Sequence, residues 1–336
     1  MYQYTRIFCF SLIVSIVFSF SGCDRDCHCP TCPDDTEKIV IWDCNYKRGY
    51  AFFLDSAYTH NYEWYDELWN HQYDVDLSVD SIKVFIDDGN DTNNADECAR
   101  IAKAVVNPEA SSPEYGDQYQ NENHTGFFRL LRSAEYILNK EMGYIKLAEP
   151  MIDEWVLAVT YKPLIYRDIP GAWIGHYVTD PASPDTSLLK VIRPFKPRPF
   201  TFQETWDLEW RNVYSLGTHI IPENGIDVKV YLDKSGAEDE EDQEGVKFVT
   251  IMGLDKFDNQ SPHEPVPDGL FDSFDAALLD LVNCELIFPT LRPFDTGFTF
   301  GSDSLEIRAP GIYDEANEQL CMQAHKYNIE VIIDRP

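Results

Sequence analysis

Positive charge is what this sequence has least of. Its 336 residues carry 27 Lys and Arg against 58 Asp and Glu, which gives a formal net charge of −31 and a pI near 4.4. Nucleic-acid phosphates need a cationic surface, so this balance argues against nucleic acid as a partner. It also disfavours direct binding to anionic lipid. We interpret the acidic residues as a solvated surface, and divalent-cation binding by some of them remains open.

Familiar catalytic motifs are also absent. The sequence has no G-x-S-x-G, no glycine-rich phosphate loop and no dinucleotide fingerprint. His263-Glu264 lacks the second histidine of a zinc-protease motif. No pair of carboxylates is singled out by spacing for glycoside hydrolysis. We therefore expect a protein that is not an enzyme, and a hydrolase with unrecognised acids remains a third alternative.

Long apolar runs are confined to the N-terminus. Residues 7–20 are apolar, follow Arg6, and are too few to span a membrane as a free helix, which indicates a signal peptide over residues 1–22. Ser21 and Gly22 are small residues directly before Cys23, as in a lipobox. We expect Cys23 to be lipidated. An ordinary signal peptide with a chance cysteine is the alternative.

Cysteines are few enough to be considered one by one. The chain has nine, and seven remain without Cys9 and Cys23. Three of them, Cys27, Cys29 and Cys32, lie with His28 in a cysteine-rich tether over residues 23–38. A metal site there is disfavoured because it lacks a second ligand pair at finger spacing. Disulfides within the tether, or from tether to domain, are favoured, and the odd count leaves at least one cysteine otherwise used.

What the chain does have is many short apolar stretches separated by turn residues, with 20 Pro and 17 Gly spread along it. We expect a mainly β fold, an antiparallel β-sandwich of jelly-roll type with a few short helices. One β-rich domain is expected over residues 39–336, with an internal boundary near 180–200.

The expected elements follow hydrophobic periodicity. Strands are expected over residues 39–42, 50–54, 76–86, 154–161, 205–216, 226–232, 249–252 and 329–333, with a hairpin over 135–147. Helices are expected over residues 99–106 and 314–325, and a short helix or turn begins at 127.

Several stretches occur in an order that resembles one known family. They are GYIKL (143–147), EWVLAVTY (154–161), WDLEWRNVYSLG (206–217), GLDKFDNQ (253–260), PDGLFD (267–272), IFPTLRPF (287–294) and APGIYDEANEQ (309–319). Together they resemble the repeated N-terminal module of the SprA (Sov) family, the outer-membrane translocon of type IX secretion and gliding motility. The chain is too short for the large pore of that family, so only the module is implied.

The resemblance implies a non-enzymatic lipoprotein at the outer membrane that contacts secretion or motility proteins. It implies no catalytic residue. Whether the protein faces the periplasm or the cell surface is left open. A surface glycan-binding lipoprotein is the alternative.

One acidic loop has the composition of a calcium site. Hard oxygen ligands recur at short intervals around Gly269, and Ca²⁺ prefers such ligands on a flexible loop. The residues are Asp255, Asp258, Asn259, Asp268 and Asp272. Their spacing is not that of an EF-hand, so the alternative is a structural loop in which Asp side chains cap turns.

Tryptophans offer a second kind of site. Trp64, Trp69 and Trp173 are candidate binding residues, because flat rings stack on the apolar faces of sugars. The alternative is plain core packing between strands. Core packing is favoured most firmly for Trp206 and Trp210, which alternate with polar residues.

Overall fold

The computed structural model describes residues 36–95, 98–108, 121–166, 168–180, 183, 185–217, 225–234, 237–241, 245–261, 264–295, 297–300, 303–306, 309–315 and 318–334. Contacts divide the chain into two units, Met1–Asp35 and Thr36–Pro336. The expected signal peptide, Cys23 and the cysteines of the tether lie outside the described residues. Among the helices that are described, none has the length and apolar character to cross a membrane.

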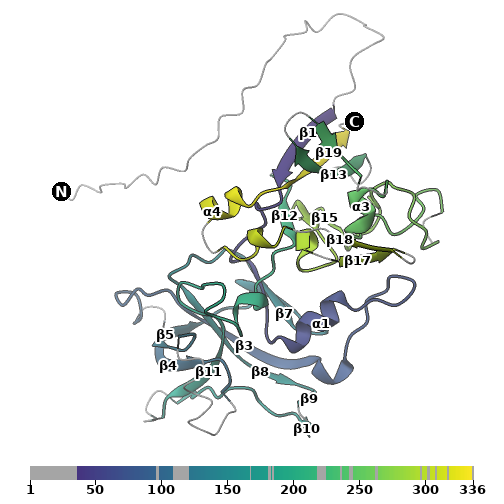
Figure 1. Cartoon of the computed structure of the whole chain (residues 1–336). Coiled ribbons are helices and arrows are strands. Elements are labelled where there is room, and N and C mark those ends of the chain that lie inside the picture. The colour runs from purple at the N-terminus through teal and green to yellow at the C-terminus, as the bar shows by residue number, and fades with distance from the viewer. Residues whose placement is uncertain are drawn as a thin grey trace, which may run out of the picture. The chain divides into compact units, whose positions relative to one another are not determined.

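Five strands of the second unit form a small closed barrel (Figure 1). In order around the barrel they are β11 (Ser187–Arg193), β4 (Arg100–Val105), β5 (His124–Leu130), β3 (Val79–Asp87) and β8 (Val156–Pro163). β11 pairs with β4 in parallel, and the other neighbours are antiparallel. Closure leaves no free edge among these strands.

Strand β8 shows why the sequence there reads as a continuous apolar run. Successive side chains of a strand point to opposite faces. Val156 and Ala158 pack in one hydrophobic cluster with Phe85 and Leu189. Leu157, Val159 and Tyr161 pack in a second cluster on the other face. Both faces of β8 are therefore buried, and even the polar Thr160 is only 1% exposed.

The second cluster extends to a three-stranded sheet and a helix. The sheet has the order β2 (Ala51–Phe53), β7 (Tyr144–Leu147) and β6 (Tyr136–Asn139), and the helix is α1 (Ala57–Glu63). Phe52 and Phe53 of β2 are fully buried, and Tyr58 and Tyr62 of α1 share their cluster. A short 3-10 helix, η1 (Val75–Leu77), leads from this region into β3.

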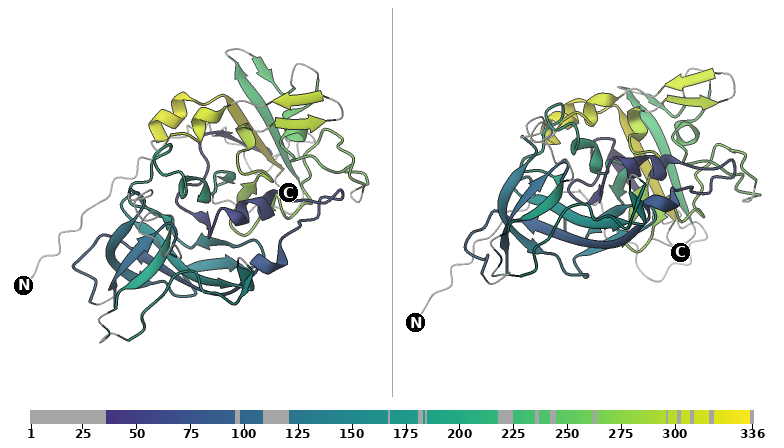
Figure 2. Two further views of the ribbon diagram at one scale, coloured as in Figure 1. Left: turned by 60° about the horizontal axis from the view of Figure 1, so that its bottom comes forward. Right: turned by 90° about the horizontal axis from the view of Figure 1, so that it is seen from below.

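A third cluster includes buried residues of two further sheets. One sheet has the order β1 (Thr36–Trp42), β19 (Tyr327–Asp334), β13 (Ile226–Lys234) and β14 (Ala237–Asp239). The other has the order β12 (Val213–Ser215), β16 (Glu285–Ile287) and β15 (Leu279–Asp280). Val331 of β19 and Leu286 of β16 belong to the same buried core. Figure 2 shows these green and yellow segments on one side of the unit and the blue to teal barrel strands on the other.

Short elements complete the described part. They are β9 (Ile165–Tyr166), β10 (Ile169–Pro170), η2 (Trp206–Leu208), α3 (Phe248–Ile251), η3 (Pro293–Asp295), β17 (Gly297–Phe300), β18 (Asp303–Glu306), η4 (Pro310–Ile312) and α4 (Glu318–Gln323).

The mainly β class is confirmed, and the closed barrel was not foreseen. The hairpin over 135–147 is confirmed as β6 and β7. The helix expected over 99–106 is wrong, because those residues form β4, whose Ala102 and Ala104 pack inside the barrel. Tertiary packing there outweighs the helix propensity of alanine and lysine. Residues 127–130 likewise belong to strand β5.

The strand expected over 249–252 is also wrong, because α3 occupies these residues. Gly253 ends this helix with φ +72°, a left-handed conformation that favours glycine. The amide of Leu254 donates to the carbonyl of Val249 at 2.9 Å, which closes the turn. Over 205–216 only β12 is a strand, and over 314–325 only Glu318–Gln323 is helical.

Candidate ligand-binding pocket

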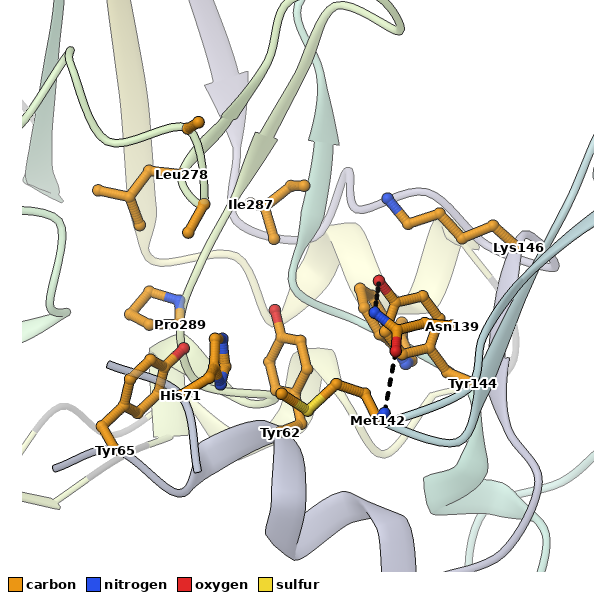
Figure 3. Close-up of a pocket in the computed structure, with 13 residues that line it drawn as sticks. Tyr62, Tyr65, His71, Asn139, Met142, Tyr144, Lys146, Leu278, Ile287 and Pro289 are labelled. Carbon is orange, nitrogen blue, oxygen red and sulfur yellow. Dashed lines mark hydrogen bonds between the residues drawn. The ribbon is translucent and has the colours of Figure 1, made fainter. Parts of the chain in front are cut away.

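A pocket of about 230 Å³ opens between the hairpin β6–β7, helix α1 with the loop after it, and the segment around β16. Figure 3 shows Tyr65, His71 and Pro289 on one side of it and Asn139, Tyr144 and Lys146 on the other. The lining residues are Tyr62, Tyr65, His71, Asn139, Met142, Tyr144, Lys146, Trp210, Ala276, Ala277, Leu278, Ile287 and Pro289. Segments that are distant in the sequence thus form one site.

The aromatic wall of the pocket is fixed by ring packing. The Trp210 ring centroid lies 4.5 Å from that of Tyr144 and 4.7 Å from that of Tyr62. Phe53 supports Trp210 from behind, with 5.5 Å between centroids. Trp210 itself is only 3% exposed. Rings packed in this way lose little conformational freedom when a ligand binds.

Hydrogen bonds hold Tyr62 in place. Its hydroxyl donates to the carbonyl of Phe288 at 3.0 Å and accepts from the Nδ2 of Asn212 at 2.8 Å. Burial raises the pKa of Tyr62 well above its usual value, so the phenol stays neutral. The hydroxyl is occupied within the protein, and the ring is what Tyr62 offers to the pocket.

Two polar atoms at the pocket are buried and have no hydrogen-bond partner within the described part of the chain. They are Nδ1 of His71 and Nε1 of Trp210. His71 stacks against Tyr65 with centroids 4.2 Å apart. Burial, together with the charge of Lys256, lowers the pKa of His71, so its ring is neutral at neutral pH. A buried polar group without a partner costs free energy, and a ligand that supplies one recovers it.

The charged residue of the pocket lining, Lys146, is paired within the protein. Lys146 Nζ lies 5.6 Å from the Trp210 ring centroid and 3.5 Å from Oε2 of Glu285. Glu285 is fully buried and also pairs with Lys47. Two lysines share this one carboxylate, and most of the remaining lining is apolar or aromatic, so the pocket suits a largely apolar group.

The predicted calcium residues are placed in one loop, where backbone amides surround their carboxylates. Asp255 accepts from the amides of Asp268 at 3.0 Å and Gly269 at 2.8 Å. Asp272 accepts from the amides of Lys256 at 2.6 Å and Phe257 at 3.2 Å.

The other three predicted ligands, Asp258, Asn259 and Asp268, are held on the same loop. Oδ1 of Asp258 accepts from the amide of Gln260 at 2.8 Å, and the amide of Asn259 donates to Asp268 at 3.1 Å. These contacts explain the loop as turn-forming structure. Calcium binding there stays a prediction.

A different group brings potential metal ligands together. Among the described residues, only Asp43, Cys44 and His325 place three such atoms within 4.8 Å of one another. Oδ1 of Asp43 pairs with Nδ1 of His325 at 2.7 Å, and Oδ2 accepts the amides of Lys326 and Tyr327 at 2.9 Å each. Asp43 is thus occupied in joining β1 to β19. Burial lowers the pKa of His325, but Asp43 and Asp233 outweigh burial and raise it.

The three predicted tryptophans come from two regions of the chain, because Trp64 and Trp69 lie after α1 and Trp173 lies after β10. Trp64 is 42% exposed and stacks on His60 at 5.5 Å. Trp69 has Lys256 Nζ 5.2 Å from its ring centroid, next to the pocket residue Tyr65.

Trp173 is 46% exposed and lines a second, shallower pocket of about 380 Å³. Lys83, Thr160, His176 and Tyr177 line it as well. Trp206 and Trp210 are buried as predicted, although neither lies in a strand.

Sequence reasoning missed most of the main pocket. Tyr144 and Lys146 lie on a hairpin that was predicted, but nothing in its sequence shows which face meets Trp210. His71 lies in a loop without periodicity. Comparison with protein-family models gives no match, and comparison with curated proteins gives none either.

Proposed function

We propose that this chain is a non-enzymatic, lipid-anchored binding module at the outer membrane, and that its aromatic pocket receives a side chain of a partner protein. The observation that carries the proposal is the pocket, whose walls are already packed and whose lining residues His71 and Trp210 each have a buried ring nitrogen without a hydrogen-bond partner in the described part of the chain. The collinear stretches that resemble the SprA family favour a partner in type IX secretion or gliding motility.

The chemistry of the lining favours a protein side chain over a sugar. Met142, Leu278 and Ile287 present apolar atoms that cannot pair with sugar hydroxyls. The side chain of Asn139 is already occupied within the protein. Its Nδ2 donates to the Tyr144 hydroxyl at 3.3 Å, and its Oδ1 accepts from the backbone amide of Met142 at 2.9 Å. An apolar or aromatic side chain with one neighbouring carbonyl matches this set of groups. The net charge of −31 favours a partner surface that is neutral or basic.

The two sheets that share the third core support a sandwich. We propose that the β1-β19-β13-β14 sheet and the β12-β16-β15 sheet pack face to face, because both contribute buried side chains to that core. This keeps the pocket, which includes Ile287 of β16, on a rigid base.

Site-specific photocrosslinking in cells tests the proposal. A photoreactive amino acid replaces Ala277, which is exposed and lines the pocket, and Ala148, which is exposed and does not line it, serves as control. We expect a crosslink to an outer-membrane secretion or motility protein from position 277 alone. The additional substitution Ala276→Trp fills the pocket and abolishes that crosslink.

Equal products from both positions, or a yield that Ala276→Trp leaves unchanged, would contradict the proposal. Urea unfolding controls for folding, and since Ala276 is exposed its replacement leaves the midpoint unchanged.

Glycan binding at Trp173 is the second candidate. The exposed indole beside a shallow pocket with Lys83, His176 and Tyr177 presents a flat ring next to hydrogen-bonding groups. A glycan array tests it with Trp173→Ala and with Phe200→Ala, which removes another exposed ring. Glycan binding at Trp173 is supported if Trp173→Ala loses retention on the array and Phe200→Ala keeps it. It is contradicted if the unaltered chain is not retained by any glycan.

A further inference from the structure

Two buried thiols meet where the first strand of the described domain approaches its last helix. Cys44 follows β1 and is 1% exposed, and Cys321 lies in α4 and is fully buried. Cys321 Sγ lies 3.8 Å from the carbonyl oxygen of Cys44, although 277 positions separate the two residues in the sequence. Each thiol also perturbs the other, because Cys321 raises the pKa of Cys44 and Cys44 lowers the pKa of Cys321.

The surroundings of the two thiols are fixed by other contacts. Asp43 holds the backbone of the neighbouring β19 through the amides of Lys326 and Tyr327. The thiol of Cys321 also reaches the carbonyl of Ile312 at 3.1 Å. Both cysteines belong to the third hydrophobic core. Packing therefore holds the two sulfur atoms side by side without needing a covalent bond to bring them there.

We propose that Cys44 and Cys321 form a disulfide bond in the exported protein. Export is the premise taken from the N-terminal signal, and the proposal does not depend on what the aromatic pocket binds. Oxidising compartments allow such bonds to form and persist. The bond joins the segment just after β1 to α4 and encloses nearly all of the described residues.

The chemistry is thiol–disulfide exchange with a donor disulfide, such as that of a thiol oxidoreductase or oxidised glutathione. The thiolate of one cysteine attacks the donor and forms a mixed disulfide, which releases the first donor thiol. The second cysteine loses its proton and attacks the mixed disulfide, which releases the second donor thiol. The two cysteines are oxidised by two electrons in total, and the donor is reduced by two. Because both thiols are buried, the reaction precedes closure of the core.

The other cysteines supply the competing outcomes. Cys98 is exposed and lies outside the third core, whereas Cys284 is half-buried and packs against that core. A bond from Cys284 to Cys44 or Cys321 is a further rival that the peptide map would show. Cys27, Cys29 and Cys32 of the tether lie outside the described residues, and a bond from one of them to Cys44 is the main rival. The pairing pattern therefore distinguishes a bond within the domain from a bond between tether and domain.

Peptide mapping tests the proposal. The full chain is isolated from membranes with an alkylating agent present, digested without reduction and analysed by mass spectrometry. We expect a joined peptide that contains Cys44 and Cys321 and separates on reduction. Alkylated Cys44 and Cys321, or Cys44 joined to a tether cysteine, would overturn the proposal.

A second measurement uses variants of the full chain refolded with oxidised glutathione. Reduction should lower the urea midpoint of the unaltered protein and of Cys98→Ser, which keeps the bond. It should leave the midpoint of Cys44→Ser and Cys321→Ser unchanged. Equal sensitivity to reduction in all of these proteins would contradict the assignment. If the two serine variants fail to fold, the peptide map of the unaltered protein decides.

Discussion

Replacing Asp272 with asparagine should stabilise the protein at neutral and alkaline pH. Asp272 is fully buried, and its Oδ2 accepts two backbone amides. Within the described residues Oδ1 has no hydrogen-bond partner. Burial, opposed by those amides and reinforced by the charges of Asp255 and Asp275, raises the pKa of Asp272 to about 6. Asparagine keeps an oxygen acceptor for the two amides and removes the buried charge.

The size of the effect follows from the pKa. The rise from 3.8 to about 6 is roughly two units, and each unit corresponds to about 1.4 kcal/mol. Because the folded-state pKa lies above the unfolded value, the contribution to stability is complete below pH 3.8 and is lost as pH rises through about 6. Asp272→Asn should therefore gain up to about 3 kcal/mol relative to the unaltered protein at about pH 8, and little at about pH 4.

Urea unfolding followed by tryptophan fluorescence measures this difference. Both proteins are compared at about pH 4 and about pH 8 with a chelator present, so that no divalent cation neutralises the loop. Asp76→Asn removes one charge from an exposed side chain and serves as the matched control. A difference in unfolding free energy between Asp272→Asn and the unaltered protein that is the same at both pH values would refute the reasoning.

Three further predictions concern other parts of the fold. Tyr62→Phe removes a hydroxyl with two buried hydrogen bonds, and urea unfolding should show a loss of about 1–3 kcal/mol. Gly253→Ala places a methyl 2.8 Å from Pro289 at φ +72°, and thermal unfolding should show a loss of at least about 1 kcal/mol. The raised pKa of His325 makes its pairing with Asp43 stabilising below the unfolded value of 6.5, and this contribution is lost as pH rises through the folded pKa. His325→Gln should flatten that part of the pH profile in urea titrations, and an unchanged profile would contradict the assignment.

Strands buried on both faces were the easiest part of the fold to predict. The run around β8 is rich in apolar, β-branched and aromatic residues, and the structure buries it between two clusters. The hairpin β6–β7 was also predicted correctly, because Gly143 marks a turn between its two strands in the sequence. In the structure Gly143 adopts φ +61°, a conformation that favours glycine. Both signals are local, so a single sequence is enough to carry them.

Elements that depend on distant partners were predicted poorly. Residues of β4 favour a helix by composition, and only barrel closure makes them a strand. The α3 segment is short and apolar, so its periodicity does not separate helix from strand. The pocket joins the loop of His71, the hairpin of Tyr144 and the segment of Ile287, and no local pattern records that they meet.

The pairing of β1 with β19 has a practical consequence for protein engineering. Thr36 lies opposite Asp334 in this antiparallel pair, so the two backbones are separated by about one interstrand spacing, roughly 5 Å. A linker of a few glycines can bridge that gap, and new ends can then be opened at an exposed turn away from the pocket, such as the one around Asp91. A circularly permuted domain made in this way would present the pocket from a differently placed attachment point.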